Sequence, residues 1–405
     1  MDKNPKGKSR PKSKSAAIDA PHRTLPVREQ LATRNFPVIG IIGQNVDAIL
    51  RIYQCLAKTL RPAYFFGQKG SGITAVGKLA LNCRGVTELD LDYFYKTPAE
   101  AVGPLKEACA RFGIDLLIPA RIKSALLLAR IEEQLGGIKV YPGPTEEHVR
   151  QLNDKLEFAR CLGRLNLPQP AYWELAEESE LERASWSYPV VVKPLELENG
   201  SGVKVCHDAQ ETLQHLRTLQ ALTAPPFIVQ EFVPGTDRDL TIIADRGKVI
   251  AWAIYERTPI KWGGNRYRFM EDRAYLEAGA RLVEALGYHG VLHLDGRYSE
   301  RDGQVKMIEG NPRLFGSVHI TAYAGVNFVK LGIDIAEASL DGKAPSQIDG
   351  DIYTGGSFAS LLLQGRLNEI LASKSSFSFL RDPFALALLK LSGQVKRMTD
   401  RGSRG

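Results

Sequence analysis

The sequence predicts an α/β domain near the N-terminus and an α+β region after it. In the first region, short apolar runs alternate with segments whose apolar residues recur at helical spacing, which is typical of a parallel sheet with crossover helices. In the second region, strands follow one another as hairpins, and helices come in mixed order. The chain has 405 residues, 44% of them hydrophobic, so a sizeable core can be buried. A length of this order predicts about two to four domains.

The N-terminal α/β domain is expected to span residues 36–150. Its first strand is the apolar run FPVIGIIG, and Pro98 marks the first turn of a later helix. The predicted strands are 36–43, 61–66, 85–90 and 114–120; the predicted helices are 46–58, 97–111 and a segment that ends at residue 135; residues 138–144 close the domain.

Two further subdomains are expected at residues 151–226 and 227–345. Two prolines in LNLPQP end the first helix of this region, and Asp208 with Glu211 three residues later forms a capping box. The predicted elements are a helix at 152–165, strands at 188–194, 198–206 and 227–235, a hairpin at 240–257 that turns at 246–248, a helix at 275–286, and strands at 290–299 and 304–313.

The net charge of +7 is concentrated in a basic tail, residues 1–35. Its first 34 residues hold nine basic and three acidic side chains, so the rest of the chain is close to neutral. This distribution argues against nucleic-acid binding by the folded body. We interpret the tail as a disordered, solubilising arm; contact with anionic lipid, RNA or an acidic partner stays open.

Several absences in the sequence lead us to expect a cytoplasmic protein. The five cysteines show no CxxC pair, which is typical of reduced thiols. No apolar stretch is long enough for a transmembrane helix, and the polar N-terminus lacks the apolar core of a signal peptide. In the C-terminal segment, 346–405, the apolar run 377–391 predicts a packed helix; a homodimer contact or a membrane-surface helix are the alternatives.

Three residues on two successive predicted strands indicate a metal site. Asp295 lies on the first strand, and Glu309 and Asn311 lie two positions apart on the second, so both point to one face. Two carboxylates and an amide oxygen suit a hard cation such as Mg²⁺. Arg313 adds a cation to this face if the strand continues beyond Pro312. An exposed strand with ordinary acids is the alternative.

A glycine pattern, Gly200-Ser201-Gly202, follows the strand that contains Lys193. Glycine lets backbone N–H groups approach phosphate oxygens because no Cβ intervenes, and a lysine can reach a phosphate as a point charge. Hairpin turns also often contain glycine, so a structural hairpin is the alternative.

A second glycine pattern, residues 72–78, has the spacing of a phosphate-binding P-loop. The next residue is Leu79, where a P-loop needs Ser or Thr to hold magnesium. We therefore interpret this pattern as a glycine-rich loop.

Taken in order, these segments resemble the ATP-grasp ligases, in the style of the carbamoyl-phosphate synthetase large chain, biotin carboxylase and related carboxylate–amine ligases. The resemblance covers residues 36 to about 340. The segment 153–170 resembles the one with the first nucleotide-binding lysine, here Lys155, and YPVVVKP resembles the strand with the second, Lys193. ENGSGV resembles the glycine loop over the triphosphate, and GVLHLD and MIEGNPR resemble the magnesium strands. The implied fold is a pair of subdomains that clasp ATP.

The resemblance also implies how the nucleotide is held. The segment 228–241 resembles the hinge strand that binds adenine, although a Glu is common in the family where Gln230 stands. The implied cofactors are ATP and Mg²⁺, with Mn²⁺ as an alternative ion. The implied nucleotide contacts are Gln230, Glu231 and Val233 at the base and Asp237 or Asp239 at the ribose, beside Gly200, Ser201 and Gly202 at the phosphates.

The implied reaction is ATP-dependent activation of a carboxylate as an acyl phosphate, which an amine then attacks, with ADP and phosphate as products. The implied catalytic residues are Lys193, Arg257 and Arg313, and the partners are a small-molecule acid and amine. Lys261 and Arg266 lie in a basic loop that could hold the acid, with a solvated loop as the alternative. Other phosphoryl transfer, carboxylase activity and a non-catalytic ATP-binding regulator stay open. His289, His293 and His319 are candidate bases, for which structural roles are the alternative.

Overall fold

The computed structural model describes most of the chain between residues 38 and 354. The predictions for the tail, for Gly200, for Lys261 and for the helix at 377–391 lie outside the described residues. All five cysteines lie inside them and none forms a disulfide, as the sequence predicted. The described ranges are 38–57, 61–80, 82–183, 185–195, 201–260, 265–340, 342 and 345–354.

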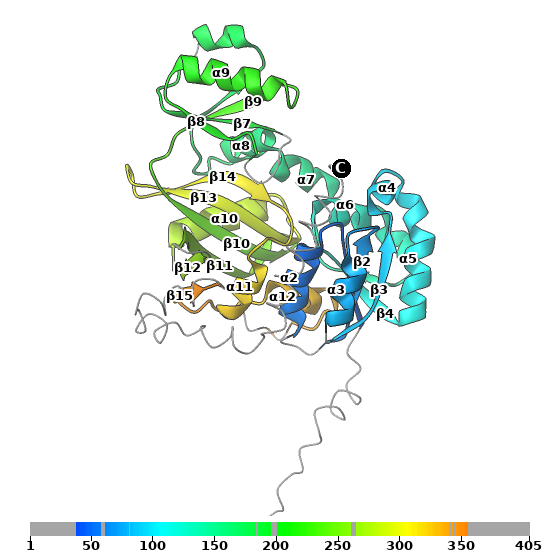
Figure 1. Ribbon diagram of the computed structural model, residues 1–405. Coiled ribbons are helices and arrows are strands. Elements are labelled where there is room, and N and C mark those ends of the chain that lie inside the picture. The colour runs from blue at the N-terminus through cyan, green and yellow to red at the C-terminus, as the bar shows by residue number, and fades with distance from the viewer. Residues whose placement is uncertain are drawn as a thin grey trace, which may run out of the picture. The chain divides into compact units, whose positions relative to one another are not determined.

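A five-stranded parallel sheet follows the tail, in the strand order β3-β2-β1-β4-β5 (Figure 1, blue and cyan). It confirms the predicted α/β domain. Its central strands are buried on both faces, which explains why they read as continuous apolar runs. The strands are β1 (Val38–Gly43), β2 (Ala63–Gln68), β3 (Cys83–Leu89), β4 (Ile114–Pro119) and β5 (Lys139–Val140).

Helices cover both faces of this sheet. α2 and α3 share one buried cluster with Ile39 and Ile41 of β1, and α5 and α6 share another with Ile42. Alternate residues of one strand therefore serve opposite layers. The helices are α2 (Val46–Ala57), α3 (Ile73–Leu79), α4 (Leu91–Lys96), α5 (Pro98–Phe112), α6 (Ile122–Ile131) and the 3₁₀ helix η1 (Glu132–Leu135).

Backbone conformation and packing explain two glycines of the P-loop-like pattern. Gly72 precedes α3 with a φ of 77°, in the left-handed region that favours glycine. Gly77 lies inside α3, where a Cβ atom would stand 2.2 Å from Val86 of β3. The pattern thus joins a short helix tightly to the sheet, in agreement with its interpretation from sequence.

A six-stranded antiparallel sheet forms the second unit, with the strand order β14-β13-β10-β11-β12-β15. The turn between β10 and β11 is made by Arg246 and Gly247, both with positive φ, as a tight hairpin requires. The strands are β10 (Gly235–Asp245), β11 (Lys248–Pro259), β12 (Asn265–Phe269), β13 (Gly290–Ser299), β14 (Val305–Asn311) and β15 (Gly350–Tyr353).

Helices also cover the two faces of the six-stranded sheet. Leu282 of α10 packs with Leu240 and Leu294 on one face. Phe328 of α12 belongs to the cluster on the other face, which extends to α2 of the N-terminal domain. The helices are α10 (Arg273–Ala285), α11 (Val318–Tyr323) and α12 (Phe328–Ala336).

A four-stranded sheet in the order β6-β9-β7-β8 forms the third unit (Figure 1, green). β9 lies beyond the predicted boundary at residue 226 and nevertheless pairs with β6 and β7. The domain boundaries themselves stay predictions. The elements are β6 (Tyr172–Leu175), β7 (Val190–Pro194), β8 (Lys204–Cys206), β9 (Phe227–Glu231), α9 (Ala209–Gln220) and the 3₁₀ helix η2 (Glu178–Arg183).

The helix predicted at residues 152–165 is present as α8, but it begins later than predicted and a further helix precedes it. The structure has two helices, α7 (Glu146–Asn153) and α8 (Lys155–Arg164), with Asp154 in an extended conformation between them. Its carboxylate accepts hydrogen bonds from the backbone N–H groups of Leu156 and Glu157, both at 2.9 Å. This N-cap stabilises a new helix start and fixes Lys155 as the first residue of α8.

Candidate functional site

Three carboxylates form a row across adjacent strands of the six-stranded sheet. Antiparallel pairing places Asp239 of β10 opposite Asp295 of β13, and Asp295 opposite Glu309 of β14. Residues that face each other in antiparallel strands have their side chains on the same face of the sheet. We call Asp239, Asp295 and Glu309 the carboxylate row.

A second row, two residues further along each strand, supports the first. It consists of Thr241, His293 and Asn311, again in cross-strand register. Asn311 Nδ2 donates to Oδ2 of Asp295 at 2.6 Å, and Nε2 of His293 lies 3.3 Å from Oδ1 of the same carboxylate. On its other side, His293 Nδ1 lies 2.8 Å from the Thr241 hydroxyl. Both oxygens of Asp295 are therefore held in place.

Cationic side chains surround the carboxylate row. Lys193 at the end of β7 is buried, and so is Lys155 at the start of α8. Lys155 Nζ donates to the carbonyl of Leu195 at 3.3 Å. β14 ends at Asn311, but Arg313 still reaches the site, because its Nη2 donates to the Asn311 Oδ1 at 2.7 Å. The structure thus brings together Asp295, Glu309, Asn311 and Arg313; their roles stay predictions.

Burial and crowding shift the protonation of these groups. Burial raises the pKa of Asp239 to about 7, although His293 opposes the shift. Burial and the charge of Asp295 raise the pKa of Glu309. Burial also lowers the pKa of Lys193 to about 8. Burial alone would raise the pKa of Asp295, but His293 and nearby arginines keep it below its ordinary value. Asp239 and Glu309 thus resist ionisation beside the charged Asp295, and a cation at the row would favour their charged forms.

The donor set fits magnesium better than a transition metal. Carboxylate and amide oxygens are the ligands that Mg²⁺ prefers. Among the described residues, Asp239, His293 and Asp295 also offer ligand atoms within 4.8 Å of one another. Both ring nitrogens of His293, however, already contact Thr241 and Asp295. An oxygen-only set, with the imidazole behind it, is therefore the better match.

The carboxylate row opens into a cavity of about 690 Å³. Lys193 and Val203 line it from the four-stranded sheet, and α2 and the residues after β4 line it from the N-terminal domain. Its other lining residues include Asp237, Arg257, Tyr267 and Arg313. The predicted catalytic residues Lys193, Arg257 and Arg313 thus share one cavity.

The two candidate ribose acids differ in their surroundings. Asp237 has a side chain that is 60% exposed, and its Oδ1 accepts a hydrogen bond from Arg297 Nη1 at 2.6 Å. Asp239 belongs to the half-buried carboxylate row. Of the two, Asp237 is the more exposed, at the rim of the cavity.

The hinge residues lie at the end of β9 and are not part of the cavity lining. Gln230 is buried, and its Oε1 has no hydrogen-bond partner among the described residues. Glu231 accepts from Arg301 at 2.9 Å, and the carbonyl of Val233 accepts from Arg297 Nε at 2.6 Å. The buried, unpaired amide oxygen of Gln230 is the feature here that a ligand's N–H group could satisfy.

The described part of the glycine loop has a structural reason for its glycine. Gly202 has a φ of +74°, and a Cβ there would lie 2.8 Å from Leu219 and 3.0 Å from Pro194. Its carbonyl lies 2.8 Å from Nε2 of His215. Ser201 is exposed. Gly202 is therefore anchored to the four-stranded sheet and α9, and its neighbour Val203 faces the cavity.

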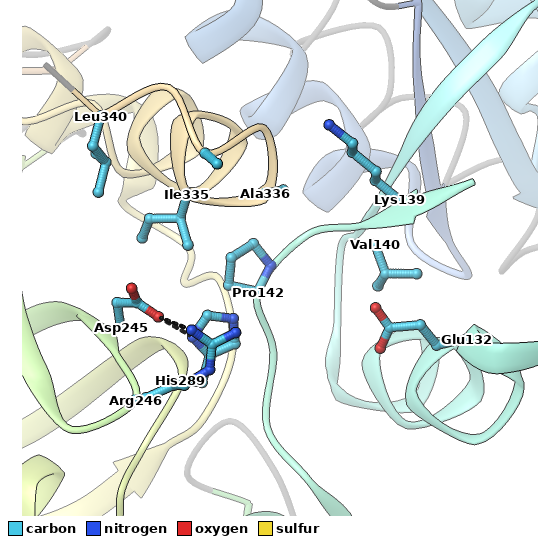
Figure 2. A pocket seen from close by; sticks show the side chains of 11 residues that line it. Glu132, Lys139, Val140, Pro142, Asp245, Arg246, His289, Ile335, Ala336 and Leu340 are labelled. Carbon is cyan, nitrogen blue, oxygen red and sulfur yellow. Dashed lines mark hydrogen bonds and ion pairs between the residues drawn. The ribbon is translucent and has the colours of Figure 1, made fainter. Parts of the chain in front are cut away.

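Other predicted residues lie away from the cavity. Arg266 on β12 forms an ion pair with Asp351 of β15 at 3.0 Å and is not among the lining residues. His319 of α11 is buried, and burial lowers its pKa to about 3. His289 lines a separate cavity, where its Nδ1 lies 3.1 Å from Asp245 (Figure 2). Of the three histidines, His293 alone lines the cavity of the carboxylate row.

Sequence reasoning did not identify Arg51, Arg121 and Tyr267 as lining residues. Arg51 lies on α2, one turn after an acidic partner, and looks like an ordinary helix-surface pair. A usable signal existed for Arg121, because it follows the carboxyl end of strand β4, where ligands of parallel sheets bind.

Known proteins share both the sequence pattern and the fold. The family described as "ATP-grasp in the biosynthetic pathway with Ter operon" matches residues 223–352. The carbamoyl phosphate synthase large chain of Clostridium beijerinckii is 25% identical over 48% of this chain and 19% of its own length. The corresponding protein of Pyrococcus furiosus is 23% identical over 64% of this chain and 25% of its own length. The chain thus spans only about a fifth to a quarter of these curated relatives.

Solved structures extend the likeness to a larger share of the chain. The dimeric biotin carboxylase domain of Hydrogenobacter thermophilus 2-oxoglutarate carboxylase, in complex with MgADP, ADP and bicarbonate, gives a TM-score of 0.58 at 16% identity, covering 78% of this chain and 73% of that one. The L-amino acid ligase of Bacillus licheniformis gives 0.57 at 20% identity, covering 77% and 78%. The resemblance to the ATP-grasp superfamily is confirmed, and the fold is an α/β domain followed by an ATP-grasp fold. None of the helices in the described part of the chain has the length and apolar content that a membrane crossing requires.

Proposed function

We propose that this protein is an ATP-dependent ligase that activates a carboxylate as an acyl phosphate and joins it to an amine. The observation that supports this most directly is the carboxylate row, with Asn311, Lys193 and Arg313 around it, in one cavity of an ATP-grasp fold. Carbamoyl phosphate synthases and an amino acid ligase among the similar proteins favour the same class of reaction.

The reaction has two steps whose atoms balance. A carboxylate oxygen of the acid attacks the γ-phosphorus of ATP, and the bond to the ADP oxygen breaks. The amine nitrogen then attacks the carbonyl carbon of the acyl phosphate, phosphate leaves with one oxygen of the acid, and the nitrogen loses a proton to solvent. Such chemistry needs positioning and neutralisation of charge more than a protein nucleophile.

The chain's own residues supply both needs. Lys155, Lys193 and Arg313 place positive charge where phosphate oxygens gain negative charge in the transition state. Arg257 at the end of β11 faces the same cavity and can hold the γ-phosphate or the acyl phosphate. Residues 201–203, in the described part of the glycine loop, cover the phosphates and exclude water, which would otherwise hydrolyse the acyl phosphate.

A magnesium ion at this site would supply positive charge that offsets the negative charge of the phosphate groups. Asp295, Glu309 and Asn311 would hold it, with Mn²⁺ as a substitute. For the nucleotide, we propose Gln230, Glu231 and Val233 at the adenine and Asp237 at the ribose. The exposed position of Asp237 at the rim of the cavity favours it over Asp239 for the ribose contact.

The test is ADP formation by the purified full chain with Mg²⁺ and ATP, screened against pools of amino acids and small carboxylic acids. We expect ADP formation that needs both an acid and an amine, and mass spectrometry should find a product joined with loss of one water. ADP formation that depends on bicarbonate would indicate a carboxylase, and phosphorylation of an alcohol would indicate a kinase. ATP binding without ADP formation in any pool would contradict the proposal and favour a regulator.

A further inference from the structure

The topology of the parallel sheet creates a crevice at a defined place. In the order β3-β2-β1-β4-β5, the chain leaves β1 toward one edge and returns to add β4 on the other side. The helix after β1 is α2, which packs on one face; the helix after β4 is α6, which packs on the opposite face. Open parallel sheets bind ligands at such a switch point, outside the carboxyl ends of the strands.

This crevice opens into the cavity of the carboxylate row. The lining residues that follow β1 are Asp47, Ala48 and Arg51 on α2, and those that follow β4 are Ala120 and Arg121. The two sides of the switch point are therefore both exposed to the space in front of the carboxylates. A ligand that reaches the carboxylate row can extend into the crevice.

The crevice is positively charged. Arg51 donates its Nε to Asp47 at 2.8 Å and an Nη1 hydrogen to the carbonyl of Gly316, so Asp47 balances its charge. Arg121 is different: within the described part of the chain, its guanidinium forms neither an ion pair nor a hydrogen bond, so no acidic side chain balances its charge. An arginine without a counterion beside a ligand cavity suits a carboxylate or phosphate, which its planar fork can bind with two hydrogen bonds.

The other acidic residues that line the cavity do not serve as a counterion for Arg121. Asp239, Asp295 and Glu309 belong to the carboxylate row, where a cation is expected, and Asp237 is paired with Arg297. Arg257 contacts the Tyr267 hydroxyl and opposes the rise that burial causes in the pKa of that tyrosine, and it forms no ion pair among the described residues. We call Arg51, Arg121 and Arg257 the arginine side of the cavity.

We propose that the acid substrate bears a second anionic group, a carboxylate or a phosphate, and that Arg121, flanked by Arg51, binds this group at the switch point of the parallel sheet. The inference rests on the proposed function, because it assigns the other carboxylate of the same substrate to acyl-phosphate formation. Arg257 faces the carboxylate that forms the acyl phosphate, and the crevice favours acids that have the second anionic group.

The test uses pairs of acids that differ only in the second charge: glutamate and glutamine, aspartate and asparagine, phosphoserine and serine. Each is assayed for ADP formation with Mg²⁺, ATP and an amine pool, and for binding by calorimetry in the presence of a non-hydrolysable ATP analogue. The variant is Arg121→Gln. The matched control is Lys123→Gln, which removes a charge from the helix that Arg121 precedes, at a position outside the cavity lining.

We expect the charged member of at least one pair to have a KM about tenfold or more below that of its neutral partner, as one charge-assisted contact allows. Arg121→Gln should remove this difference through KM, with kcat nearly unchanged, and Lys123→Gln should preserve it. The pair that responds tells a carboxylate from a phosphate. Equal use of charged and neutral acids by the wild type, or equal effects of the two variants, would overturn the inference and leave the ligase proposal intact.

Failure of the ligase proposal has a different signature. If no acid supports ADP formation, calorimetry decides about the crevice alone. Binding of a charged acid that Arg121→Gln abolishes would support the anion site, and absence of such binding would overturn it.

Discussion

The two sides of the cavity are built in different ways. The carboxylate row lies on three adjacent strands of one sheet, so ladder hydrogen bonds fix its spacing. The arginine side comes from three separate elements: α2, the residue before α6, and the end of β11. A site fixed by one sheet suits chemistry that tolerates little displacement. A site assembled from separate elements can change its ligand without disturbing that chemistry.

The largest effect should come from breaking the carboxylate row. Glu309→Gln removes one charge from the proposed magnesium site and should lower the rate of ADP formation by about 10²–10³, the cost of a lost preorganised charge. The fold should persist, because Glu309 has a raised pKa and gains little stability from ionisation. Circular dichroism and thermal melting verify the fold.

The control for this variant is Glu300→Gln, which removes an exposed acid from the turn after β13. It should match the wild type in rate. A well-folded Glu309→Gln protein with wild-type ADP formation would show that the carboxylate row is not the metal site.

A smaller effect is expected from pH. Burial raises the pKa of Asp239 to about 7, above the value of about 3.9 in an unfolded chain. Between these values the folded state keeps a proton that the unfolded state has released, so this group's contribution to stability falls as pH rises from about 4 to 7. A cation near the carboxylate row replaces that proton, so magnesium should bind more tightly at pH 8 than at pH 6.

Thermal melting with an ATP analogue measures this dependence. The rise in melting temperature that Mg²⁺ produces should be larger at pH 8, and Asp239→Asn should reduce the difference between the two pH values. Arg121→Gln, on the other side of the cavity, should retain it. A magnesium effect equal at both pH values in the wild type would contradict the protonation assigned to Asp239.

The smallest effect concerns the four-stranded sheet, which belongs to neither side. Gly202→Ala places a Cβ against Leu219 and Pro194 at a left-handed φ, which costs about 1–2 kcal/mol for the conformation alone. Denaturant unfolding should register this loss, and the preference between charged and neutral acids should stay unchanged. Hydrogen exchange of residues 201–206 with and without nucleotide then tests whether the segment closes over phosphates.

Sequence reasoning succeeded where the chemistry is local to a strand pair. Glu309 and Asn311 share a face because side chains alternate along a strand, and Asp295 joins them because the next strand in sequence is also the next in space. The same logic failed for Asp239, which joins the row from β10. This strand is separated from β13 along the chain by β11, β12 and α10, and no local pattern reveals its register. It also failed at Asp154, where one cap divides a periodic segment into two helices.

The arginine side was only partly predictable. Arg257 was among the residues that the resemblance implied, and Arg121 follows the carboxyl end of strand β4. Arg51 was not predictable, because it lies in a domain whose chemistry looks unremarkable in sequence, and only the packing of α2 near α11 and α12 brings it to the cavity. Lys193, in contrast, was recognisable from the strand and the glycine pattern after it. Arg51 thus reaches the cavity through long-range packing, whereas Lys193 could be predicted from a local pattern.

The most direct test of the central claim is a calorimetric titration of a non-hydrolysable ATP analogue, with and without Mg²⁺, into wild type, Glu309→Gln and Arg121→Gln. We predict that Mg²⁺ strengthens nucleotide binding in the wild type and equally in Arg121→Gln, whereas Glu309→Gln loses this magnesium dependence. If Glu309→Gln keeps the full magnesium dependence, the carboxylate row does not bind the metal–nucleotide complex, and the proposed mechanism is wrong.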